Sequence, residues 1–93
     1  MDEIQQLKED ARRADEARRV LQSESFIGAF EALRKDLQRQ MSAVKPTDSQ
    51  TKDKLIDMWQ LVDALERYFV KTIETGDVAV MQLEEKKKFK VFG

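Results

Sequence analysis

The sequence predicts an all-α protein, and three observations support this fold class. Apolar residues recur at steps of three and four along three long segments, which is the spacing of one face of an α-helix. Only three Gly and one Pro occur in 93 residues, too few for the tight turns of an all-β fold. Cysteine and histidine are absent, so there is no disulfide framework, Cys/His zinc site or His-based catalytic triad. We predict a long antiparallel helical hairpin with an N-terminal helical extension and a short C-terminal helix or tail.

The first predicted helix spans about residues 2–22. Its apolar positions at helical spacing are Ile4, Leu7, Ala11, Ala14 and Leu21. This stripe is thin because alanine supplies much of it, and an isolated helix of this length is marginal in water. We therefore expect the segment to pack against the rest of the chain or against another copy.

The second predicted helix runs from the serines at 23 and 25 to about Val44. Its stripe is stronger and comprises Phe26, Phe30, Leu33, Leu37, Met41 and Val44. Either serine can cap the helix by accepting backbone N–H bonds. Since neither Gly nor Pro stands at this break, two alternatives remain: a loop between two helices, or a kink in one long bent helix.

The third predicted helix covers about residues 48–75, after a loop around Pro46. Pro46 disfavours helix in the residue before it. Thr47 and Gln50 have capping-box spacing, so Thr47 is expected to cap the helix. Gly76 is expected to end it as a C-terminal cap. A helix of about 28 residues would be roughly 42 Å long.

The residues after Gly76 allow two structures. A last helix could span about residues 78–88, capped by Asp77; alternatively 78–81 and 89–92 could pair as a β-hairpin. The helix is favoured because residues 84–88 contain no Gly, Asn or Pro to form the turn. Residues 89–93 are expected to be extended or disordered in the free protein.

The apolar stripe of the third segment is wider than a two-helix hairpin can cover, which indicates a protein–protein contact. A small domain also buries little surface by itself. We therefore predict one helical domain over residues 1–85 that forms a homo-oligomer. The expected buried spine is Leu55, Met58, Trp59, Leu61, Val62, Leu65 and Phe69, opposite Phe26, Phe30, Leu33 and Leu37.

Residues 86–93 form a basic and aromatic tail with four lysines and no acidic residue. The residues expected to bind a partner are Lys86, Lys87, Lys88, Phe89, Lys90, Val91 and Phe92. Three functions compete, in this order: an anchor that docks into a groove, a strand added to a partner's sheet, and a weak nucleic-acid contact. A merely solvated, charged end is the alternative to all three.

Enzymatic function is not predicted, because no catalytic motif is present and no cofactor or metal is implied. Carboxylates share helix faces at Asp53/Asp57 and Asp63/Glu66. We interpret them as a solvated face, since metal sites in helical bundles usually include His. No stretch is apolar enough to cross a bilayer, and the acidic N-terminus has no signal core. The expectation is therefore a cytoplasmic protein that does not contact membranes.

The layout resembles small all-helical proteins from the virion-assembly and DNA-packaging gene region of tailed bacteriophages. The resemblance covers about residues 11–85, beginning with an alanine- and arginine-rich first helix. It rests on Leu21, Phe26, Phe30 and Leu33, on the loop at 46–48, and on Ile73, Glu74, Thr75, Gly76, Ala79 and Leu83. It implies a role in particle assembly or packaging with another phage or host protein as partner, in the host cytoplasm or the virion, and it brings no catalytic residues.

The alternative function is nucleic-acid binding through the arginines of the first helix and the lysine tail. The whole chain carries 17 basic and 18 acidic residues, and acidic residues alternate with those arginines. Such interleaving favours a coiled-coil-like surface over a track of cations that follows phosphates. Nucleic-acid binding is therefore possible but not favoured.

Overall fold

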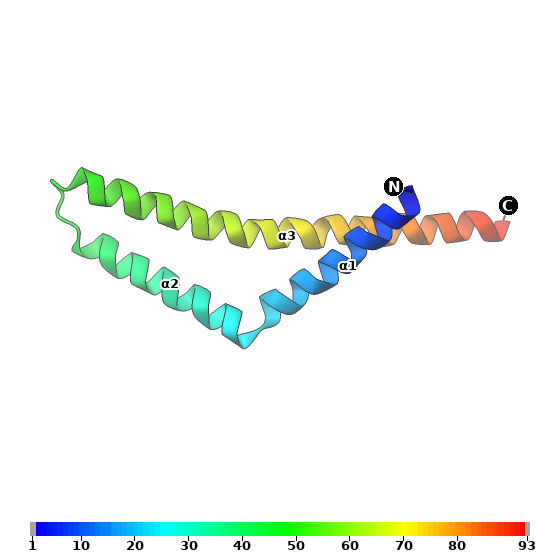
Figure 1. The fold of residues 1–93 in the computed structure, drawn as a ribbon, viewed down its shortest axis with the longest axis horizontal. Coiled ribbons are helices and arrows are strands. Elements are labelled where there is room, and N and C mark those ends of the chain that lie inside the picture. The colour runs from blue at the N-terminus through cyan, green and yellow to red at the C-terminus, as the bar shows by residue number, and fades with distance from the viewer. Residues whose placement is uncertain (1, 93) are drawn as a thin grey trace. The chain divides into compact units, whose positions relative to one another are not determined.

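The computed structural model describes the backbone of residues 2–92 and the side chains of residues 2–88. Three helices make up this stretch (Figure 1): α1 (Glu3–Gln22), α2 (Glu24–Ala43) and α3 (Ser49–Phe92). The residues between 2 and 92 include no β-strand. The predicted all-α class is confirmed, as is the preference for helix over a β-hairpin after Gly76.

The break between α1 and α2 is a capped helix start and not a kink. Ser23 has an extended backbone (φ −68°, ψ 129°), and its hydroxyl oxygen accepts a hydrogen bond from the Phe26 N–H at 3.4 Å. A helix needs such acceptors because its first N–H groups have no partner within the helix. Ser23 thus separates two helices of 20 residues each.

The start of α3 is capped by Asp48, so the expectation for Thr47 was wrong by one residue. One carboxylate oxygen of Asp48 accepts the Thr51 N–H at 3.1 Å, and the other accepts the Thr51 hydroxyl at 2.7 Å. Both bonds favour the ionised carboxylate and hold the pKa of Asp48 below its usual range. A carboxylate at a helix N-terminus also interacts favourably with the helix dipole.

Helix α3 continues through Gly76, where the sequence predicted a stop, and extends to Phe92. No described glycine has a positive φ, so Gly76 does not cap the helix. Asp77 pairs with Arg18 and does not begin a new helix. Residues 89–92 are helical and not extended, and the backbone shows no break at the expected boundary between 85 and 86. The side chains of 89–93 lie outside the described residues.

Two compact units divide the chain, and each pairs one helix with part of α3. Unit 1 comprises Met1–Leu21 and Tyr68–Gly93, and unit 2 comprises Gln22–Arg67. In unit 1, the closely packed residues are Leu7, Ala14, Ala17, Gly76 and Ala79. Most of them are small, so the two backbones approach each other closely. Ion pairs join α1 to α3 at Glu3–Lys86 and at Arg18–Asp77.

Gly76 permits this close approach. A Cβ atom at position 76 would collide with the Ala14 side chain and lie 2.7 Å from the Asp10 carbonyl oxygen. The glycine is therefore required by the neighbouring helix and not by its own backbone conformation.

In unit 2, α2 and the first part of α3 lie side by side (Figure 1). The core residues are Leu37, Leu55 and Val62, with Phe30, Val44 and Trp59 partly buried against them. Arg34 of α2 pairs with Glu66 and lies 3.7 Å from Asp63 on α3. Among the described side chains, Leu37 is the one large residue that is fully buried.

Candidate interaction surfaces

The predicted spine of α3 divides into a buried and an exposed part. Leu55 and Val62 are buried, and Trp59 and Phe69 are half-buried. The single chain leaves the other three on the surface: Met58 is 45% exposed, Leu61 70% and Leu65 49%. Leu33, expected opposite the spine, is also 40% exposed. The expected spine was that of an oligomer, so the burial of these exposed residues stays a prediction.

Helix geometry explains the division of the spine. Successive residues are rotated by about 100° around a helix of 3.6 residues per turn. The core contact of α3 follows positions 55, 59 and 62. Leu61 and Leu65 fall on a neighbouring face, which α2 does not cover. The apolar spacing predicted both faces, but it did not indicate which of them packs against α2.

Met58, Leu61 and Leu65 form an exposed row that we call the apolar ridge. Their spacing of three and four residues places them on one face of α3. Apolar rows of this kind on a surface mark sites of protein–protein contact. The ridge lies entirely within unit 2.

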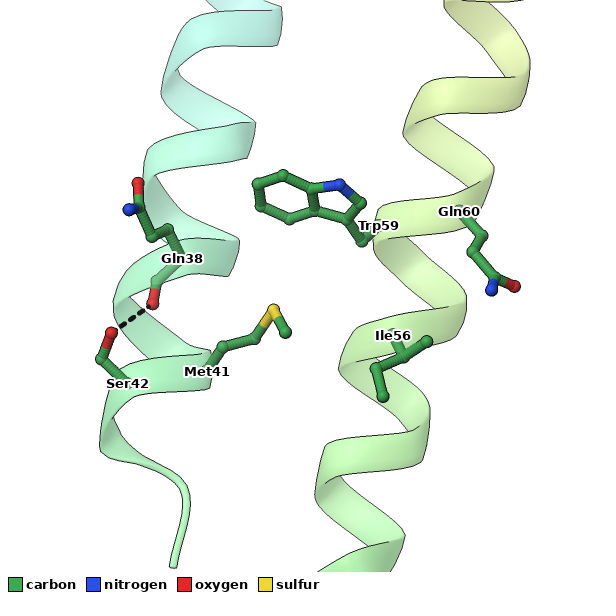
Figure 2. Close-up of a pocket in the computed structure, with 6 residues that line it drawn as sticks. All are labelled: Gln38, Met41, Ser42, Ile56, Trp59 and Gln60. Carbon is green, nitrogen blue, oxygen red and sulfur yellow. Dashed lines mark hydrogen bonds between the residues drawn. The ribbon is translucent and has the colours of Figure 1, made fainter.

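A second apolar surface of unit 2 is a groove of about 560 Å³ between α2 and α3, which we call the apolar groove. Its lining residues, drawn in Figure 2, are Gln38, Met41, Ser42, Ile56, Trp59 and Gln60. Trp59 and Met41 extend from facing helices into the space between them (Figure 2). The Ser42 hydroxyl donates to the Gln38 carbonyl at 2.9 Å. The lining carries no charge.

This groove was not predicted from the sequence. Ile56 and Trp59 were part of the wide stripe, and Met41 belonged to the stripe of the second segment. Ile56 is 41% exposed although its neighbour Leu55 is buried. Apolar residues adjacent in sequence point about 100° apart on a helix, so consecutive apolar pairs were the available signal for a second apolar surface.

Ridge and groove occupy different faces of α3. Ile56 lines the groove, and Met58, two residues later, begins the ridge. Two residues correspond to a rotation of about 200°. The two surfaces therefore face nearly opposite directions from the same stretch of helix.

Unit 1 contains a polar recess of about 330 Å³ lined by Asp10, Arg13, Tyr68, Lys71, Thr72 and Thr75. Several of these groups already have partners within the chain. The Thr72 hydroxyl donates to the Tyr68 carbonyl at 2.8 Å, and the Gln6 amide donates to Asp10 at 3.0 Å. Arg13 donates to Glu9 at 3.3 Å. One acid and two bases in an open recess favour no single class of ligand.

The arginines of α1 are largely occupied by ion pairs. Arg12 pairs with Glu9 and Glu16, and Arg18 pairs with Asp15 and with Asp77 of α3. The pKa of Arg12 is raised above its ordinary value, chiefly by its hydrogen bond to Glu9. The pKa of Glu9 is lowered in turn by Arg12. Cations neutralised in this way are poorly suited to binding phosphates.

Carboxylates that share a face of α3 serve an ion pair. Asp63 and Glu66 both contact Arg34, and the hydrogen bond to Glu66 is the main cause that raises the pKa of Arg34. Within the described part of the chain, no three potential metal ligands lie together. None of the helices there is both long enough and apolar enough to cross a membrane.

The basic tail begins as the last turns of α3. Lys86 lies 3.5 Å from Glu3 of α1. Lys87 and Lys88 are exposed, and neither forms an ion pair with any side chain between 2 and 88. The side chains of Phe89, Lys90, Val91 and Phe92 lie outside the described residues, so the tail site is only partly placed.

Comparisons with known proteins reveal no relatives. The chain matches no protein-family model, no curated protein and no solved structure.

Proposed function

We propose that this chain is a non-enzymatic helical assembly protein whose copies associate through the apolar ridge of α3. The observation that carries the proposal is the exposure of Leu61, at 70%, between Met58 and Leu65 on one helix face. Exposing such a row to water is unfavourable by about 25 cal/mol per Å² of apolar surface. A second copy that covers the ridge would recover this free energy.

The thin core of unit 2 supports the same proposal. Leu37 alone contributes a large, fully buried side chain among the described residues. Chains of this size bury a small share of their surface and are marginally stable. Association stabilises a folded chain by mass action. An oligomer would therefore add stability that the small core of a single chain does not provide.

The tail is proposed to bind a second protein. Lys87 and Lys88 are exposed, and the sequence adds Phe89 and Phe92 beyond them. Cations beside aromatic residues suit an acidic groove with an apolar floor. The resemblance to phage assembly proteins favours a phage or host protein as this partner, in particle assembly or DNA packaging.

Absolute mass in solution tests the self-association. Light scattering behind a sizing column should give a multiple of 10.9 kDa for the full chain and for a chain that ends at Glu85. Leu61→Glu should reduce the mass to that of a single chain. Val78→Glu is the matched control, because Val78 is also exposed, at 52%, but lies outside the ridge.

Two outcomes of the mass measurements have distinct meanings, and a separate nucleic-acid binding assay at several salt concentrations tests the alternative function. A single-chain mass for the unmodified protein at all concentrations would refute self-association. Association of the full chain without association of the shortened chain would place the contact in the tail and not in the ridge. Binding of nucleic acid that weakens steeply with salt would favour the nucleic-acid alternative.

A further inference from the structure

Helix α1 packs on α3 through fewer large side chains than α2 does. The buried residues of α1 are Leu7, Ala14 and Ala17, and those of α3 in the same unit are Gly76 and Ala79. Leu7 is the one residue among these five that is larger than alanine. In unit 2 the buried core consists of leucines and a valine, with aromatic rings packed against them. Burial of apolar surface is the main force that holds helices together, so α1 is held less strongly than α2.

The ion pairs between α1 and α3 add little to this contact. Arg18 pairs with Asp77, and Glu3 lies 3.5 Å from Lys86. Their side chains are 39–73% exposed. Exposed pairs contribute little to stability because water and salt screen them. These pairs therefore do not compensate for the small apolar contact.

Ser23 gives α1 a hinge that leaves α2 intact. It is the single residue between the end of α1 and the start of α2. Its hydroxyl oxygen accepts the Phe26 N–H, and its carbonyl oxygen accepts the Ile27 N–H at 2.9 Å. Rotation about the N–Cα bond of Ser23 would move α1 and leave both of these bonds in place. One residue at the end of an element is enough to form such a hinge.

Helix α1 also carries ion pairs of its own, which do not depend on α3. Arg12 pairs with Glu9 and with Glu16, one turn away on either side. Such pairs support an isolated helix, although one of 20 residues is marginal in water. We propose that α1 is a hinged arm, which detaches from α3 as a partly helical segment while unit 2 stays folded. The closed arm buries Gly76 and Ala79, and the open arm exposes them to solvent.

Native-state hydrogen exchange of the full chain, resolved by peptide mass spectrometry, tests the arm. A segment that opens locally exchanges its amide hydrogens without global unfolding. After correction for intrinsic rates, amides of residues 7–22 should exchange at least about tenfold faster than those of residues 29–42. Equal protection of the two ranges would overturn the proposal, because it would mean that α1 and α2 open together.

Gly76→Ala should open the arm selectively. The added methyl group collides with Ala14, and overpacking of this size should speed exchange in α1 by about 5- to 150-fold. Exchange in α2 should not change. Alanine is a better helix former than glycine, so a weaker α3 cannot be the cause. Val78→Ala is the matched control, because it places the same residue in the same turn at an exposed position and should not affect α1. Faster exchange in α2 by the same factor as in α1 would overturn the proposal.

The arm does not depend on the proposed self-association, and Leu61→Glu separates the two. Leu61 belongs to the ridge and lies in unit 2. In this variant α1 should still exchange faster than α2, whether or not copies of the unmodified protein associate. Equal protection of α1 and α2 in Leu61→Glu would overturn the arm, because any difference in the unmodified protein would then come from contacts between copies.

Discussion

Two glycines of this chain occupy helix interiors in opposite surroundings. An added Cβ at Gly28 of α2 would meet nothing within 4 Å, whereas one at Gly76 would collide with Ala14. Alanine is the better helix former by about 1 kcal/mol in an exposed helix interior. We therefore expect Gly28→Ala to raise the free energy of unfolding by about that amount.

Gly76→Ala should have the opposite sign. Its methyl group must displace α1 or distort the contact, and such overpacking destabilises by about 1–3 kcal/mol. Urea unfolding measures the change in the free energy of unfolding for both variants. Gly28→Ala is the control for helix propensity. Stabilisation by Gly76→Ala would mean that α1 does not pack on α3 at this position.

Two leucines of unit 2 should likewise respond differently to truncation. Leu37→Ala removes the fully buried side chain and should lower the free energy of unfolding by about 2–5 kcal/mol. Leu65 is 49% exposed in the single chain, so Leu65→Ala should lower it by about 1 kcal/mol or less at high dilution. Denaturant unfolding at low protein concentration measures both, and equal losses would contradict the division between core and ridge.

At the scale of elements, the cap of α3 makes stability depend on pH. The two bonds from Thr51 lower the pKa of Asp48 in the folded chain below its ordinary value of 3.8. A lowered carboxyl pKa contributes stability that is full above the unfolded value and is lost as the pH falls through the folded value. Asp48→Asn should therefore differ most from the unmodified protein above about pH 5, and the difference should shrink in acid.

Unfolding by urea at a series of pH values measures this difference. Thr51→Val is the companion variant, because it removes the hydroxyl donor but keeps the backbone N–H. It should retain part of the pH dependence. A constant difference between Asp48→Asn and the unmodified protein across acid pH would show that Asp48 does not act as the ionised cap.

The helices themselves were largely predictable from sequence, whereas one helix end was not. The stripes of residues 2–22 and 25–44 and the cap at Ser23 are local features, and local sequence carries them. Gly76 followed by Asp77 has the sequence of a helix end, but its role is decided by Ala14, which is 62 residues away in the chain. A glycine needed for packing and a glycine needed for capping look alike until the partner helix is known.

The candidate surfaces were predictable only in part, for a related reason. Periodicity indicated that α3 has more apolar residues than one helix contact requires, and Leu55 and Val62, two members of the expected spine, are buried in the single chain. It could not separate the covered face from the ridge, since that depends on the register between α2 and α3. The groove depends on two segments at once, which single-helix patterns do not describe.

At the scale of the whole molecule, the ridge should couple stability to concentration. If copies associate through folded surfaces, the Tm of the unmodified protein should rise with protein concentration. For a dimer, each tenfold increase in protein concentration raises the free energy of unfolding by about 1.4 kcal/mol. The Tm of Leu61→Glu should be independent of protein concentration. Differential scanning calorimetry of the unmodified protein and of this variant, over a hundredfold range of protein concentration, measures both. A Tm of the unmodified protein that does not change with concentration would contradict association of the folded chain.

The position of Trp59 gives the molecule an optical probe of its own. It is the only tryptophan of the chain, it is half-buried, and it lines the apolar groove. The emission of an indole ring shifts to shorter wavelength when water is excluded from its surroundings. The wavelength of maximum tryptophan emission therefore reports whether the groove is filled. Entry of an apolar group into the groove can therefore be followed in real time, without any label, from the light emitted by one side chain.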